Sequence, residues 1–230
     1  MYSAKTILDL INNYKLDEAK AKLEANYREE LTLASGKAKR GYNPLKLIEK
    51  MFKSGNQTDK RLNGVAHKQP NGEYHFINGY VIFTASESYG FREAEPHELL
   101  KTDKMFPNDY DLENSFTVNR KELDLFIKTK AHKGNGKYGN KPYVVETKNG
   151  IIGINPEFLQ TALDYCQSDT IRFGKIEEGK GLKSPIVIYD ELENENVKAL
   201  VLPVNPQPIE KTIEYMKSWR EEYKEVLSNI

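Results

Sequence analysis

The sequence predicts an α+β protein in which amphipathic helices pack on antiparallel sheets. Two observations carry this prediction. Short runs rich in Val, Ile, Phe and Tyr alternate with turn residues over 62–85 and 143–204. Segments with apolar residues at helical spacing, several of them preceded by an Asn cap, lie before, between and after these runs. We therefore expect helical extensions at both ends of the chain.

Residues 1–55 predict a helical N-terminal extension. Apolar side chains recur at helical spacing from Ile7 to Tyr14, and again from Leu16 to Leu31. A third helix is expected after Asn43, because Asn is a good N-cap and the following Pro suits the first helical position. This helix should end near Ser54-Gly55.

Residues 56–114 predict a partial or degenerate module of short strands. Strands are expected over 62–66, 74–77 and 80–85, and Asn78-Gly79 between the last two is a strong hairpin signal. One or two helical turns are expected within 95–101. A surface connection should follow over 103–114.

Residues 115–205 predict a more regular domain, followed by a C-terminal helix within 206–230. A strand at 116–118 leads through Asn119, a good N-cap, into a helix over 120–129. Asn155-Pro156 starts a second capped helix that extends to Ser168. The final helix is expected over 209–227. The remaining strands are expected over 143–146, 151–154, 170–173, 185–189 and 198–204.

The composition indicates a soluble, intracellular protein. The 34 basic and 34 acidic residues give no net charge, so any contact with nucleic acid requires a local basic surface. The apolar runs are shorter than the roughly 20 residues of a membrane span, and the N-terminus lacks the apolar block of a signal peptide. The single cysteine excludes an internal disulfide, and we expect a cytoplasmic protein with no membrane partner.

No motif for catalysis, for a cofactor or for a metal is recognisable. Walker, GxSxG, HExxH and dinucleotide-binding patterns are absent from the sequence. Cys166 lies on an apolar helix face, which favours a buried small side chain over a nucleophile. Four histidines lie in no metal-ligand spacing: His67, His75, His97 and His132. We therefore expect neither an active site nor a bound cofactor.

A basic stretch occupies the end of the helix over 120–129 and the following loop, and it holds Lys128, Lys130, His132, Lys133, Lys137 and Lys141. It suits a surface that faces phosphates. On its own, it fits compensation of the helix dipole by a solvated loop better. The sequence leaves both interpretations open.

Several stretches occur in an order that points to one family. They are 116–123 (FTVNRKEL), 152–163 (IGINPEFLQTAL), 184–188 (SPIVI) and 197–204, which ends in Leu202-Pro203-Val204, with Ile77-Asn78-Gly79-Tyr80 upstream. Laid end to end, they resemble a domain of the bacterial DNA polymerase III β sliding clamp over roughly residues 60–205. The resemblance implies a non-catalytic, clamp-like module whose helices line a ring around duplex DNA.

The resemblance also implies which residues bind. Its best DNA-facing candidates lie on the first helix and are Arg120, Lys121, Lys128 and Lys130. The basic stretch adds Lys133, Lys137 and Lys141 to them. Its partner-binding candidates, on the closing strand and the added C-terminal helix, are Leu202, Pro203, Val204, Met216 and Trp219. The helix over 156–168 departs from this pattern because it carries no Lys or Arg.

Residues 122–126 (ELDLF) resemble the short peptide by which bacterial partners dock into sliding clamps. A docking peptide must be exposed and extended. This segment lies in a predicted helix whose Leu123, Phe126 and Ile127 suit a core, so we favour a core role.

The leading hypothesis is a clamp-like, non-catalytic accessory protein of DNA replication or repair, encoded by a phage or mobile element. It would tether double-stranded DNA without sequence preference, recruit replication or repair proteins, and form homo-oligomers. The alternative is a clamp-fold protein-interaction module that does not encircle DNA. A third hypothesis is an enzyme with a dispersed site, although no pair of carboxylates is singled out by its spacing.

Overall fold

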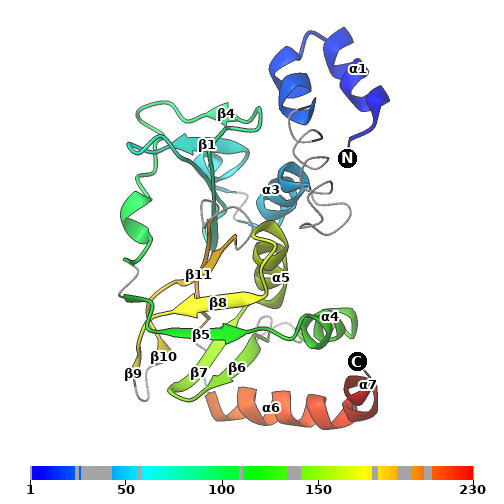
Figure 1. Ribbon diagram of the computed structural model, residues 1–230, viewed down its shortest axis with the longest axis vertical. Coiled ribbons are helices and arrows are strands. Elements are labelled where there is room, and N and C mark those ends of the chain that lie inside the picture. Colours follow the sequence, from blue (N-terminus) through cyan, green and yellow to red (C-terminus); the bar gives the residue numbers. More distant parts are fainter. Residues whose placement is uncertain are drawn as a thin grey trace. The chain divides into compact units, whose positions relative to one another are not determined.

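In the computed structural model, the chain has an α+β fold divided into two compact units, and the predicted class is confirmed (Figure 1). The first unit comprises 1–105, 164–168 and 189–199, and the second comprises the remaining segments up to 230. The four-part division expected from the sequence stays a prediction. The structure describes residues 2–23, 26, 43–55, 58–108, 111–133, 141–177, 181–190, 198–204 and 209–229.

The first unit begins with helix α1 (Ala4–Asn12). Ser3 caps it by accepting a hydrogen bond from the backbone N–H of Thr6 at 3.1 Å. The helix ends at Asn12, because Tyr14 has a left-handed backbone conformation (φ 58°), and the N–H of Lys15 then reaches back to the carbonyl of Leu10 at 2.8 Å. A second helix runs through residues 16–23, so the predicted break between the two helices is confirmed.

Helix α3 (Pro44–Lys53) starts where the sequence predicts. The side chain of Asn43 accepts a hydrogen bond from the N–H of Lys46 at 3.0 Å. The apolar face of this helix is buried in the unit, and Phe52 lies edge-to-face with Phe76, with 6.4 Å between ring centroids. The amphipathic spacing of the sequence therefore fixes which side of α3 faces the sheet.

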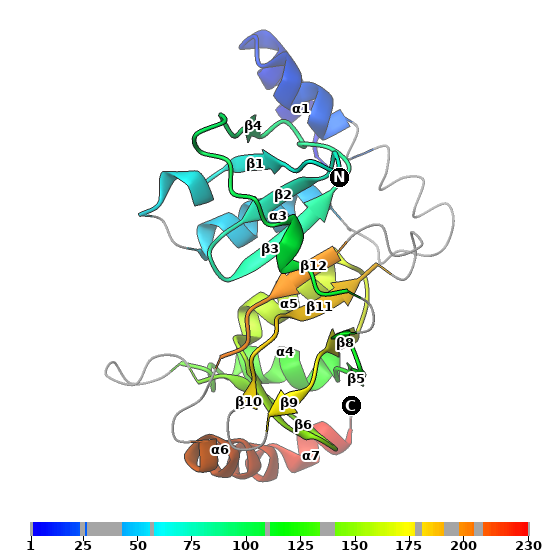
Figure 2. The ribbon, with the colours of Figure 1, turned by 90° about the vertical axis from the view of Figure 1, so that its left-hand side faces the viewer.

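The strands of the first unit follow the order β4-β1-β2-β3 (Figure 2). Asn78 makes the predicted hairpin turn between β2 and β3, because its Oδ1 accepts from the N–H groups of Tyr80 and Val81. The pairs of β1 with β2 and of β2 with β3 are antiparallel, and the short pair of β1 with β4 is parallel. The strands are β1 (Val65–Lys68), β2 (Tyr74–Ile77), β3 (Val81–Ala85) and β4 (Arg92–Glu93).

Two short 3-10 helices replace segments that we expected to be extended or irregular. The helix η1 (Lys60–Leu62) is capped by the side chain of Asp59, so the first strand begins later than predicted. The helix η2 is Asp103–Met105. Local capping by an Asp side chain thus overrides a strand-like apolar pattern at residue 62.

The second unit contains antiparallel pairs of β5 with β8 and of β8 with β11, and a hairpin of β6 with β7. The pair of β9 with β10 was not foreseen, since two-residue strands leave no periodic pattern. The strands are β5 (Asn114–Thr117), β6 (Tyr143–Thr147), β7 (Gly150–Ile154), β8 (Thr170–Phe173), β9 (Ile176–Glu177), β10 (Gly181–Leu182), β11 (Ile186–Tyr189) and β12 (Lys198–Val201). The last residue of β11 and the first two of β12 belong to the first unit.

Helices α4 (Arg120–Lys128) and α5 (Pro156–Tyr165) match the predicted pair of capped helices. Helix α5 ends earlier than predicted, because Gln167 has a left-handed backbone conformation (φ 49°). The expected single C-terminal helix is instead α6 (Ile209–Glu222) followed by α7 (Lys224–Ser228), with the break at Tyr223. No helix among the described residues is long and apolar enough to cross a bilayer.

Candidate nucleic-acid interface

The candidate interface is built on helix α4. The Oδ1 of Asn119 accepts hydrogen bonds from the N–H groups of Lys121 and Glu122, both at 3.2 Å, and this cap starts the helix. Leu123 and Phe126 are fully buried in the unit. The opposite side of α4 therefore faces solvent. The expected core role of residues 122–126 is confirmed.

Four of the predicted DNA-facing lysines are exposed on α4 and the turn after it. We name Lys121, Lys128, Lys130 and Lys133 the α4 lysine surface. Lys121 and Lys128 are two helical turns apart, so they share a face. Within the described residues, the side chains of Lys128, Lys130 and Lys133 form no ion pair.

The two carboxylates on the same helix, Glu122 and Asp124, accept hydrogen bonds from other side chains of the second unit. Glu122 accepts hydrogen bonds from Arg220 Nε at 2.9 Å and from the Tyr143 hydroxyl at 3.2 Å. Asp124 accepts a hydrogen bond from the Gln160 side-chain amide at 2.6 Å. These contacts turn the negative charge of α4 toward the interior of the unit, which leaves positive charge on its exposed side.

The carboxylate of Glu122 also changes the pKa values of its neighbours. Burial raises the pKa of the Tyr143 hydroxyl, and the negative charge of Glu122 raises it further. The pKa of Arg220 is likewise raised by Glu122, against the opposing effect of burial. Tyr143 therefore stays neutral and Arg220 stays charged at any physiological pH. The contacts of Glu122 with Tyr143 and Arg220 thus hold α4 to β6 and α6 throughout this pH range.

The other basic candidates are placed differently. Arg120 is largely buried and pairs with Asp169, with 3.1 Å between its Nε and the carboxylate. Lys141 is half-buried, and its Nζ lies 3.3 Å from the centroid of the Tyr215 ring, in a cation–π contact. Lys137 lies outside the described residues. The structure thus groups four of the seven candidates on one surface and gives Arg120 and Lys141 internal contacts.

The partner-binding candidates also divide into two groups. Leu202 and Val204 are exposed after β12, with Pro203 half-buried between them, and the N–H of Val204 bonds to the carbonyl of Gly153 at 2.8 Å. Met216 and Trp219 are instead buried, because the apolar side of α6 packs inside the unit. Their role in partner binding stays a prediction, and in this structure neither side chain forms part of the surface.

Trp219 shows why the C-terminal helix belongs to the fold of the second unit. Its ring lies edge-to-face with Phe126, with 5.0 Å between centroids, and its Nε1–H donates to the Thr129 hydroxyl at 3.3 Å. Tyr215 adds a hydrogen bond from its hydroxyl to the carbonyl of Ala131 at 2.7 Å. Helix α6 therefore holds the end of α4, and with it the turn that carries Lys130 and Lys133.

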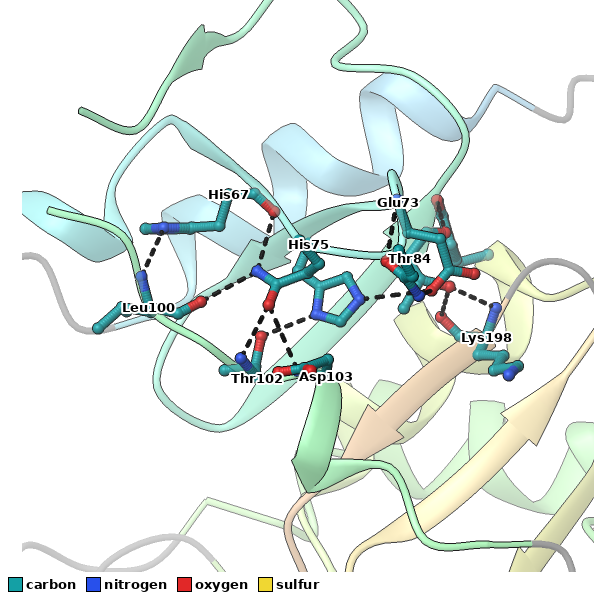
Figure 3. A network of polar contacts seen from close by, with 11 residues as sticks. His67, Glu73, His75, Thr84, Leu100, Thr102, Asp103 and Lys198 are labelled. Atoms are coloured by element: carbon teal, nitrogen blue, oxygen red, sulfur yellow. Dashed lines mark hydrogen bonds and ion pairs between the residues drawn. The ribbon is translucent and has the colours of Figure 1, made fainter. Parts of the chain in front are cut away.

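Two histidines in the first unit form a buried polar network (Figure 3). His67 Nε2 lies 2.8 Å from the carbonyl of Arg61 and must donate to it, while its Nδ1 accepts from the N–H of Leu100 at 3.2 Å. These two contacts fix a neutral tautomer. Burial lowers the pKa of His67, which agrees with a neutral ring.

Gln69 and His75 complete this network, and sequence reasoning missed Gln69 because a lone Gln carries no motif. The Gln69 amide donates to the carbonyls of His67 and Leu100, both at 3.0 Å, and its Oε1 accepts from the N–H of Thr102 at 3.0 Å. His75 Nδ1 lies 2.7 Å from the Thr102 hydroxyl (Figure 3). Because these groups are buried and hydrogen-bonded to one another, we interpret the network as structural. It holds the segment at 100–103 against strands β1 and β2.

Among the described residues, no group of three or more His, Cys, Asp or Glu side chains is arranged to hold a metal ion. Cys166 is fully buried, and burial raises the pKa of its thiol.

The chain matches no protein-family model and no curated protein. Its structure is similar to solved DNA polymerase sliding clamps from Pseudomonas aeruginosa (TM-score 0.47, 12% identity) and Bacillus subtilis (0.41, 14%), and to the beta subunit from DNA polymerase of Streptococcus pyogenes (0.44, 12%). Each match covers 70% of this chain. The matches cover 64%, 63% and 64% of those chains, respectively, so this chain spans less than two thirds of their length.

Proposed function

We propose that this protein is a clamp-like, non-catalytic accessory factor of DNA replication or repair, which contacts duplex DNA through the α4 lysine surface. The observation that carries the proposal is the separation of charge on α4. Its lysines face solvent, while Glu122 and Asp124 are bound to internal partners. Arg120, Lys137 and Lys141 are secondary contributors in this proposal.

The zero net charge of the chain decides how it can attract DNA. The chain has no net charge, so only a local cluster of lysines attracts a phosphate backbone. Lysine ammonium groups bind phosphates as point charges, without reading base edges, so the contact is indifferent to sequence. With four lysines engaged, the logarithm of the binding constant should fall with the logarithm of salt concentration with a slope of about −4 or shallower.

The test is binding of the full chain to a labelled duplex, measured by fluorescence anisotropy at several salt concentrations. The double variant Lys128→Glu, Lys130→Glu should bind at least about tenfold more weakly and with a salt slope shallower by about 2. A matched control reverses Lys211 and Lys217, two exposed lysines of α6, and should bind as the parent protein does. Equal losses in both variants, or no binding by the parent, would overturn the proposal.

Tethering by encirclement is a separate part of the proposal. It predicts that the protein is retained on nicked circular DNA and lost when the circle is linearised, because a ring slides off a free end. Equal retention on both forms would indicate surface contact without encirclement. We place this activity in the cytoplasm, with a phage or mobile element as the expected source.

The exposed pair Leu202 and Val204 favours a second function, a protein-interaction module that does not encircle DNA. Both side chains lie after β12, in the segment that bridges to Gly153 of β7, and they present apolar surface to a partner. In that case, a purified replicative DNA polymerase should bind the chain without DNA. Leu202→Glu should abolish this binding, while Lys128→Glu should leave it unchanged.

A further inference from the structure

Lys130, in the turn after α4, has a left-handed backbone conformation with φ 56°. A residue with a Cβ is strained in this conformation, which persists where neighbouring contacts hold it. The Lys130 side chain is exposed and belongs to the α4 lysine surface, and its carbonyl accepts a hydrogen bond from the N–H of Lys133 at 2.9 Å. The contacts that fix this turn therefore decide how two lysines of the surface are presented.

Two side chains of α6 hold the residues on either side of Lys130. The Tyr215 hydroxyl donates a hydrogen bond to the carbonyl of Ala131 at 2.7 Å. The Trp219 Nε1–H donates to the Thr129 hydroxyl at 3.3 Å. Tyr215 and Trp219 are four positions apart and so lie on the same face of the helix. One face of one helix therefore fixes the backbone before and after Lys130.

The ring of Tyr215 makes a second contact near this turn. The Nζ of Lys141 lies 3.3 Å from the ring centroid, and the backbone N–H of Lys141 donates to the carbonyl of His132 at 2.6 Å. On the side of α5, His132 Nε2 lies 3.2 Å from a carboxylate oxygen of Glu157. Burial raises the pKa of the Tyr215 hydroxyl, so this group keeps its proton and donates its hydrogen bond throughout the physiological pH range.

We infer that Tyr215 is a positioning residue for the contact with duplex DNA, and that α6 tunes the affinity of the α4 lysine surface through the turn at Lys130. The inference rests on the proposed function. The Tyr215 hydroxyl brings no charge to the phosphates. It restricts the backbone around Lys130 before binding, so less conformational freedom is lost when the ammonium group meets a phosphate. Its effect on affinity is therefore independent of salt, whereas the effect of a lysine is not.

The test is binding of the full chain to a labelled duplex, measured by fluorescence anisotropy over a range of salt concentrations. Tyr215→Phe removes the hydroxyl and keeps the ring beside Lys141. We expect the dissociation constant to rise about threefold to tenfold, the contribution of one hydrogen bond, with an unchanged salt slope. Lys130→Gln should instead weaken binding and make the salt slope shallower by about 1.

A double-mutant cycle separates positioning from a general loss of structure. Because Tyr215 acts on Lys130, Tyr215→Phe should weaken binding less in the Lys130→Gln background than in the parent. Hydrogen exchange gives a readout that needs no DNA. The amide of Lys133, which bonds to the carbonyl of Lys130, should exchange faster in Tyr215→Phe than in the parent.

Tyr223→Phe is the matched control. It removes a tyrosine hydroxyl just after α6 that forms no hydrogen bond with any described residue. This variant should keep the parent's dissociation constant, salt slope and exchange rate at Lys133. A loss of affinity equal to that of Tyr215→Phe would contradict the assignment of the effect to Tyr215.

The remaining outcomes each decide the inference. A dissociation constant of Tyr215→Phe within about twofold of the parent's, or unchanged exchange at Lys133, overturns it and leaves the proposed function standing. Equal losses in the parent and Lys130→Gln backgrounds also overturn it, because Tyr215 then does not act through Lys130. A parent protein that does not bind the duplex at any salt concentration overturns the proposed function itself, and this inference with it.

Discussion

Acidification should destabilise the first unit through His75. Its side chain is 1% exposed, with Nδ1 bonded to the Thr102 hydroxyl at 2.7 Å. Burial lowers its pKa from the ordinary 6.5 to about 4, and the nearby carboxylate of Glu73 only partly opposes this effect. The unfolded chain therefore takes up a proton at this residue well before the folded chain does.

The size and the pH range of the effect follow from these two pKa values. Between pH 6.5 and about 4 the unfolded state binds more protons, so stability falls as the pH falls. The full difference corresponds to about 3 kcal/mol of unfolding free energy, most of it lost by pH 4.5. Glu98, whose pKa its hydrogen bond with Arg92 lowers to about 2, loses its contribution only below about pH 4.5, at the acid end of this range.

The assay is urea unfolding of the full chain between pH 7.5 and 4.5, with hydrogen exchange of the β1 and β2 amides as the local probe. His75→Asn keeps a polar group near Thr102 but cannot titrate, so its unfolding free energy should depend much less on pH. Fluorescence of Trp219, the only tryptophan, follows the second unit and serves as the internal comparison. A variant that retains the parent's pH dependence would refute this reasoning.

Three further predictions concern single groups. Cys166 should resist a thiol reagent in the native protein and react only on unfolding, because it is fully buried and its thiol pKa is raised; rapid native labelling would contradict this. Arg220→Met should lower the free energy of unfolding, measured in urea, by about 1–3 kcal/mol, because it removes the main charge partner of Glu122. Adding Glu122→Gln should recover part of that stability. Lys130→Gly should stabilise the protein by up to about 1 kcal/mol while weakening DNA binding, because residue 130 has φ 56°; a less stable variant would refute the argument from backbone strain.

The sequence by itself determined the elements whose signals are contiguous. The helices after Asn43 and Asn119 start where predicted, because an Asn cap needs only the backbone N–H groups of the next few residues. The hairpin at Asn78-Gly79 is confirmed for the same reason, since the turn is built from its own side chain and backbone. The α+β class followed from these local elements.

Only the tertiary structure decided which site candidates reach solvent. The contact of Arg220 with Glu122 joins residues 98 positions apart, and no periodic pattern reports such a pair. It turns a carboxylate of α4 inward, while Trp219 becomes interior because Phe126 and Thr129 meet it in space. Local propensity specifies a helix and its apolar face, but the charge that a surface presents depends on long-range partners that only folding brings together.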